Sequence, residues 1–146
     1  MIGEKIYEYD LDITGVADFG VSMQAIAAGE VTVPPQGARF DIAFDGRGKG
    51  RISGRVRGVD YLRLRADGRL NLDIRATIET GDGHRIALSA GGVGVPRAGE
   101  PITDLFENVC LTTAAADYAW VNARQVWGVG TASLATGKIH VEGYLQ

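Results

Sequence analysis

The sequence predicts an all-β protein, a single antiparallel β-barrel of about nine or ten strands, and three observations favour this class. Short runs alternate between apolar and polar residues, as strands with one face on a core do. Asp-Gly turn signals separate several of these runs. The 146 residues include 21 glycines without a collagen-like period, which suits tight turns and close strand approaches. Closing the strands into a barrel would leave no edge exposed.

The first half of the chain supplies most of the alternation. Two apolar-rich runs predict strands at 5–13 and 21–33, although Ala27, Ala28 and Gly29 weaken the second. Residues 38–44 alternate cleanly and end at an Asp-Gly pair, so they form the next predicted strand. The remaining runs that alternate and flank the turn signals predict strands at 51–57, 59–65, 69–80 and 84–90.

The C-terminal third alternates less evenly. Its glycines and prolines predict a loop at 91–104, and such loops often border sites. A short strand at 108–113 and one short helical turn within 114–123 follow. Strands at 125–132 and 138–145 close the sheet, so residues 1–146 form a single domain without a linker or internal repeat.

Composition excludes several classes of function. The net charge of −3 gives no overall attraction to nucleic acid or to anionic membranes, and the basic stretch 46–75 contains few aromatic residues. No stretch approaches the roughly 20 apolar residues of a membrane-spanning helix. Cys110 is the single cysteine, and His84 and His140 are isolated, so neither a disulfide nor a metal-binding motif is predicted. The acidic first ten residues lack a signal-peptide pattern, and we expect a soluble, cytoplasmic protein without a metal or cofactor.

The turn signals also predict which polar residues share a face. A two-residue turn at Asp67-Gly68 pairs Ala66 with Arg69, and counting outward then places Asp60, Asp73 and Arg75 inside the barrel. The same rule at the next Asp-Gly pair, residues 82–83, extends this face to Glu79. A three-residue loop with a bulge would instead shift the pairing.

The opposite face of these strands is then the outer surface. It would carry an apolar stripe formed by Leu70, Leu72 and Ile74. Such a stripe is a candidate contact between copies of the chain, so we expect a homodimer or a higher homo-oligomer.

Several motifs in order resemble a known family of bacterial and fungal proteins. They are Gly-Arg-Gly at 46–48, Gly-x-Val-x-Gly-x-Asp-Tyr at 54–61, Leu-Asp-Ile-Arg-Ala-Thr-Ile-Glu-Thr at 72–80, Tyr-Ala-Trp-Val-Asn at 118–122 and Gly-Val-Gly at 128–130. In this order they resemble domain of unknown function 3237, also called uncharacterised protein family 0311. The resemblance implies a small β-barrel whose interior bears an aspartate, an Asp-x-Arg pair and an aromatic residue. By position these are Asp60, Asp73, Arg75 and Trp120. The resemblance assigns no reaction.

The predicted interior residues suggest acid/base chemistry on a small molecule. Asp60 or Asp73 would move a proton, and Arg75 would hold a carboxylate or an enolate. Three residues of the helical turn, Tyr118, Trp120 and Asn122, would bind the ligand at a barrel mouth, and Glu79 lies farther along the same face. The leading hypothesis is therefore a cofactor-free lyase, hydratase or isomerase acting on a small carbonyl or aromatic compound.

Structural explanations of the same residues stay open. The charged residues could form an ion-pair ladder, Glu79 could be a solvated strand end, and the helical turn could only plug the barrel. The alternatives to an enzyme are a binding barrel without turnover and a structural subunit that forms oligomers.

Overall fold

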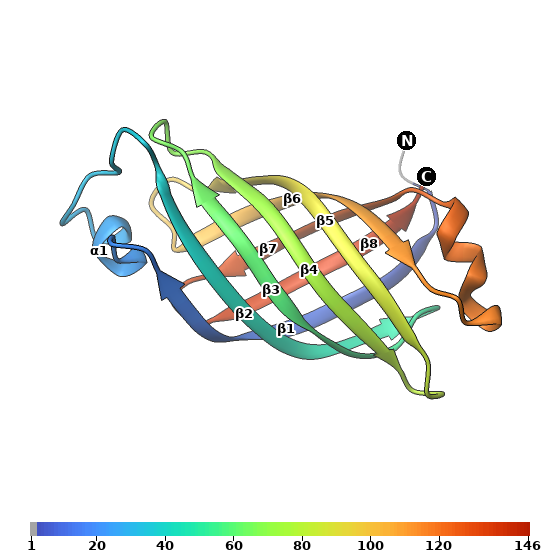
Figure 1. The fold of residues 1–146 in the computed structure, drawn as a ribbon. Helices are drawn as coiled ribbons and strands as arrows, with labels where there is room; N and C mark the ends of the chain where they lie inside the picture. Colours follow the sequence, from blue (N-terminus) through green and yellow to red (C-terminus); the bar gives the residue numbers. More distant parts are fainter. Residues whose placement is uncertain (1–2) are drawn as a thin grey trace.

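The computed structural model describes residues 3–146, and these form one closed antiparallel barrel of eight strands (Figure 1). Each strand pairs with its neighbours in sequence, and the last pairs with the first, so the predicted barrel is confirmed with eight strands instead of nine or ten. The strands are β1 (Lys5–Asp18), β2 (Ala38–Gly50), β3 (Gly54–Leu64), β4 (Leu70–Thr80), β5 (Arg85–Pro96), β6 (Ile102–Thr112), β7 (Val126–Ser133) and β8 (Lys138–Leu145).

Two short helices lie at opposite ends of the barrel (Figure 1). The 3-10 helix η1 (Ala116–Ala123) confirms the predicted helical turn. The helix α1 (Met23–Ala27) lies at the other end, and Ser22 caps it by accepting a hydrogen bond from the Ala25 N–H at 3.3 Å. Neither helix is long and apolar enough to cross a membrane.

Four predicted elements differ from the structure. The strand expected at 21–33 is wrong, because α1 and turns occupy this stretch and Gly29 has a positive φ of 73°. The runs 51–57 and 59–65 belong mostly to one strand, β3. The loop expected at 91–104 is wrong in its bounds, because β5 extends to Pro96 and β6 begins at Ile102, which leaves only 97–101 as a turn. Gly92 shows the reason: a Cβ atom there would lie 2.0 Å from the Phe106 carbonyl oxygen, so this glycine permits close strand approach.

The hairpin between β3 and β4 has a three-residue loop. The Arg65 N–H donates to the Arg69 carbonyl at 2.9 Å, which leaves residues 66–68 as the loop, with Gly68 at a φ of +91°. The pairing is therefore Leu64 with Leu70. The hairpin between β4 and β5 is built in the same way, with Gly83 at a φ of +92°.

Compared with the predicted two-residue turn, the extra loop residue reverses which side chains of β4 face the barrel interior, because successive side chains of a strand point to opposite faces. The side chains of Leu72 and Ile74 are buried, whereas those of Asp73 and Arg75 are exposed. The predicted two-residue turns are thus wrong. The outer apolar stripe of Leu70, Leu72 and Ile74 is wrong as well, since its members face the core, and the predicted homo-oligomer loses that surface.

The barrel interior has a filled half and a hollow half. Toward η1, large aliphatic side chains that are at most 2 % exposed fill the barrel, among them Ile6, Ile52, Val56, Ile78, Ile86, Val121 and Val126. Toward α1, the interior encloses a cavity of about 670 Å³. This volume lies within the range of small-molecule sites.

Candidate active site

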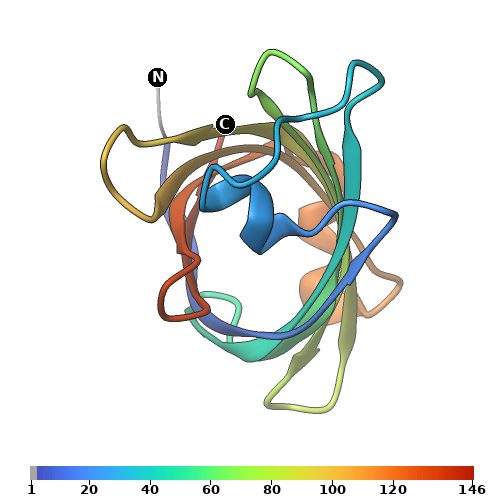
Figure 2. The same ribbon diagram turned by 90° about the vertical axis from the view of Figure 1, so that its left-hand side faces the viewer.

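The cavity is apolar and opens at the α1 end of the barrel. Figure 2 looks at this end, where α1 lies across part of the opening. Met23 and Ile26 of α1 line the cavity together with Gly68, Leu134 and the turn after β5. Its walls are mainly aliphatic and aromatic side chains, including Leu11, Phe40, Ile42, Phe44, Leu62, Leu72, Ile74 and Val141. Few polar side chains reach the cavity, and these few supply its chemically reactive groups.

Asp60 reaches the cavity from β3. It alternates with Leu62 and Leu64, so the strand period turns its carboxyl inward, as the sequence predicts. One carboxyl oxygen, Oδ1, accepts a hydrogen bond from the Asp73 backbone N–H at 3.0 Å. Burial raises the pKa of Asp60 to about 6, although the hydrogen bond from Asp73 works in the opposite direction.

Glu107 reaches the cavity from β6 and is 5 % exposed. Its Oε1 atom has no hydrogen-bond partner within the described chain. Burial raises its pKa to about 7, the negative charge of Asp60 adds to the increase, and the neighbouring Tyr9 hydroxyl opposes it. Gly128 on β7 makes room for this side chain, because a Cβ atom there would lie 2.9 Å from Oε1.

Two tyrosines of β1 complete the polar part of the interior. The rings of Tyr7 and Tyr9 stack with centroids 5.2 Å apart, and Tyr9 lines the cavity. Burial and the charge of Glu107 raise the pKa of both phenols, so both stay neutral near pH 7. Gly143 leaves the space that the Tyr7 ring fills, since a Cβ atom there would lie 2.2 Å from Tyr7 Cζ.

Asp60 and Glu107 are a pair of acids that line one cavity. Burial raises the pKa of each toward neutral pH, and the negative charge of Asp60 further disfavours ionisation of Glu107. At neutral pH such a pair presents one carboxylate and one carboxylic acid, which supplies a proton acceptor and a proton donor in one apolar space.

Other predicted catalytic residues lie outside the barrel. Asp73 and Arg75 are 57 % and 63 % exposed, with Asp73 Oδ1 and Arg75 Nη2 3.5 Å apart. Arg75 also donates to Ser89 Oγ at 2.7 Å. Glu79 forms an ion pair with Arg57 at 2.8 Å on the same outer face. Their predicted place inside the barrel is wrong, because both hairpins carry the extra loop residue.

The predicted ligand-binding residues of η1 do not line the cavity. Tyr118 donates its hydroxyl to Asp82 at 2.9 Å. Trp120 lies under Arg51, whose Cζ atom is 3.9 Å from the ring centroid. Asn122 bonds both the N–H and the carbonyl of Thr113, at 2.9 and 2.7 Å. These contacts close the end of the barrel opposite the mouth. The helix η1 thus has the role of a plug, which was the structural alternative considered in the sequence analysis.

Glu107 is the site residue that the sequence prediction misses. The glycines and prolines of 91–104 suggested a loop that covered the start of β6, and residues 105–107 belong to no predicted element. The signal was present nonetheless, because Thr103, Leu105, Glu107, Val109 and Leu111 alternate with more exposed residues through β6. A single carboxylate among the apolar residues of a strand's inward face is the sequence pattern that indicates such a site.

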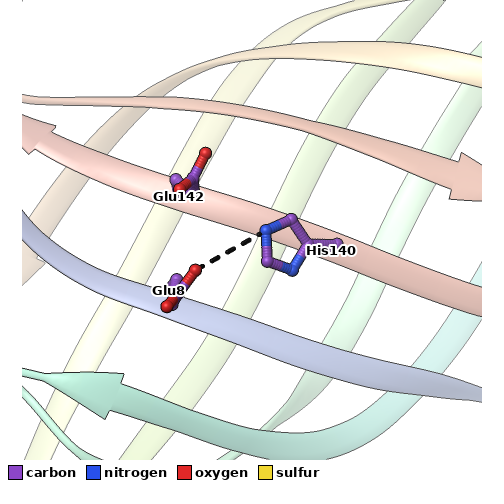
Figure 3. Close-up of side chains that lie close together, drawn as sticks. All are labelled: Glu8, His140 and Glu142. Atoms are coloured by element: carbon purple, nitrogen blue, oxygen red, sulfur yellow. Dashed lines mark ion pairs between the residues drawn. The ribbon is translucent and has the colours of Figure 1, made fainter.

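A second group of ionisable residues lies on the outer face of β1 and β8. Glu8, His140 and Glu142 face one another there (Figure 3), with potential metal-ligating atoms within 4.8 Å of one another. Lysines already neutralise the carboxylates: Lys5 lies 3.1 Å from Glu142, and Lys49 lies 3.3 Å from Glu8. This group is therefore a half-buried ion-pair network on the outer face.

The fold places the chain among small, closed antiparallel β-barrels, and its own cavity contains two acids. The chain itself belongs to the family described as "Protein of unknown function (DUF3237)", which matches residues 16–144. The family resemblance seen in the sequence is thus confirmed. No functionally curated protein matches the chain.

Solved structures share this fold at low sequence identity. A β-barrel-like protein from Acinetobacter baumannii is 20 % identical with a TM-score of 0.78, over 99 % of this chain and 94 % of that one. A protein of unknown function from Clostridium acetobutylicum is 18 % identical with a TM-score of 0.80, over 97 % and 94 %. An enzyme from Penicillium herquei is 18 % identical with a TM-score of 0.65, over 97 % and 92 %.

Proposed function

We propose that this protein binds a small, largely apolar molecule in the barrel cavity and catalyses proton transfer on it. The observation that carries the proposal is the pair of buried carboxyls, Asp60 and Glu107, in an otherwise apolar cavity. Burial of ionisable groups is costly, and perturbed pKa values cluster at functional sites. The description of the Penicillium herquei protein as an enzyme also supports catalysis on this fold.

The pair can divide the two halves of a proton transfer. The carboxylate, which Asp60 holds more readily, removes a proton from carbon, and the neutral acid, which Glu107 holds more readily, protonates the departing or receiving atom. Tyr9 offers a neutral hydroxyl to an oxygen on which negative charge develops. The reactions that use these parts are elimination, hydration and isomerisation of a carbonyl or aromatic compound.

This assignment replaces the role suggested for Arg75. Its guanidinium lies on the outer face and does not line the cavity, so it cannot hold an enolate there. The Tyr9 hydroxyl takes over that role within the cavity.

The Kemp elimination of 5-nitrobenzisoxazole tests whether the cavity holds an accessible base. A carboxylate removes the ring C–H proton, the nitrile forms, the N–O bond breaks and the phenolate leaves. We expect Asp60→Asn and Glu107→Gln each to lower the rate by about a hundredfold or more. The wild-type rate should rise as Asp60 ionises near pH 6 and fall as Glu107 ionises near pH 7, because the reaction uses one carboxylate and one carboxylic acid.

Glu142→Gln is the matched control, because it removes a carboxylate from the outer face of the same barrel, away from the residues that line the cavity. Its rate should equal that of the wild type. If the wild type, Asp60→Asn and Glu107→Gln all react equally fast, the cavity contains no working base. Binding of apolar ligands without any elimination would favour the alternative of a binding barrel without turnover.

A further inference from the structure

The charges along the cavity all have one sign except at its mouth. Asp60 and Glu107 lie inside, and Glu100 lies at the rim. Arg97 is the cation that lines the cavity. Its Nη2 atom lies 2.7 Å from Asp104 Oδ1, and its Nη1 atom lies 3.9 Å from Glu100 Oε2. Its charge is therefore neutralised locally, and among the residues that line the cavity none offers an unpaired cation to a ligand.

Among the hydrogen-bonding groups of the cavity, acceptors outnumber donors. Glu107 Oε1 accepts no hydrogen bond, and Asp60 accepts one, from the Asp73 N–H. Tyr9 and Thr103 contribute the two side-chain hydroxyls of the cavity wall in the described part of the chain. Two carboxyls together have more acceptor sites than these neighbours fill, and a buried acceptor without a partner is unfavourable. A well-matched ligand supplies the missing donors.

We propose that the ligand combines an apolar body with a polar group that donates hydrogen bonds, preferably a protonated amine, and that the cavity rejects the carboxylate of the same skeleton. An ammonium group carries three donors and a charge opposite to that of the pair. A carboxylate would bring a third negative charge and acceptors alone. The inference rests on the proposed function, because it takes the interior pair to be the ligand site.

Binding of an ammonium group also predicts a release of protons. A positive charge beside Asp60 and Glu107 favours their ionised forms, so the proton that the pair holds near pH 7 should leave. The other ionisable groups that face the pair are Tyr7 and Tyr9 from β1, whose phenols stay neutral, and the charge of Asp73 acts on Asp60 from β4.

Three ligands with one ring system test the proposal: 1-naphthylmethylamine, 1-naphthylmethanol and 1-naphthoate. Isothermal titration calorimetry at pH 7 measures their affinities, and buffers of different ionisation enthalpy report proton release. We expect the amine to bind most tightly, the alcohol less tightly, and the carboxylate at least about tenfold more weakly than the amine. Proton release should accompany the amine alone.

Glu107→Gln and Glu142→Gln form a matched pair of variants. The first removes a charge inside the cavity and should bring the affinities of amine and carboxylate closer together. The second removes a charge from the outer network of Figure 3 and should leave the order of affinities unchanged. Equal affinity of the wild type for amine and carboxylate, or no binding of any of the three, would overturn the proposal.

The two proposals fail separately. A preference for the amine without Kemp elimination supports this ligand class and contradicts catalysis. Elimination that depends on Asp60 and Glu107, without a preference for the amine, supports catalysis and contradicts this ligand class.

Discussion

Glu107→Gln should stabilise the protein at alkaline pH and leave its stability at acid pH nearly unchanged. Raising a pKa from 4.5 to about 7 corresponds to a cost of about 3 kcal/mol for the ionised side chain in the folded state. Below pH 4.5 the carboxyl is protonated in both the folded and the unfolded state, so it costs nothing there. As the pH rises from 4.5 to about 7, the wild type progressively loses this stability and the glutamine variant does not.

Urea unfolding at pH 4.5, 6 and 8 measures the effect. The difference in the free energy of unfolding between variant and wild type should grow to about 3 kcal/mol at pH 8, with an unchanged dependence on urea concentration. Glu142→Gln removes a carboxylate from the outer face and should show no such growth. A Glu107→Gln protein less stable than the wild type at pH 8 would refute the reasoning, because it would show that the buried carboxylate is well compensated.

Three further predictions follow from the packing. Gly128→Ala should destabilise the protein by about 1–3 kcal/mol in urea unfolding, because the added methyl group meets Glu107. This cost should be smaller in a Glu107→Ala background. Gly15→Ala is the control, since a Cβ atom there has nothing within 4 Å. Arg75→Ala should change the free energy of unfolding by less than about 0.5 kcal/mol and leave Kemp elimination intact, as rate measurements would show. Trp120→Ala should lower the melting temperature without changing the calorimetric affinity for 1-naphthylmethylamine, since its ring lies outside the cavity.

The sequence predicts the barrel because alternation is a local signal that survives in almost every strand. Asp60 shows the strength of this signal, since its alternation with Leu62 places it inside whatever the turn does. Asp73 and Arg75 show its limit. Their direction depends on whether the hairpin loop has two or three residues, and Asp67-Gly68 fits both, because glycine takes the positive φ that either turn needs.

Glu107 marks the second limit of prediction. The glycines of β5, such as Gly92, look like loop residues but permit strands to pass within van der Waals contact. Only the three-dimensional packing distinguishes these two uses of glycine. That Asp60 and Glu107 line one cavity is a long-range property of the barrel, because β4 and β5 lie between their strands in the sheet.

The entrance of the cavity and its proton-transfer groups lie on different parts of the chain. The acids stand on β3 and β6, within the rigid wall, whereas much of the entrance is formed by α1 and by turns such as 97–101. Surface segments of this kind tolerate insertions, deletions and exchanges far better than strands do. Grafting different entrance segments onto this barrel is thus a practical route to new ligand specificities with the proton-transfer groups left untouched.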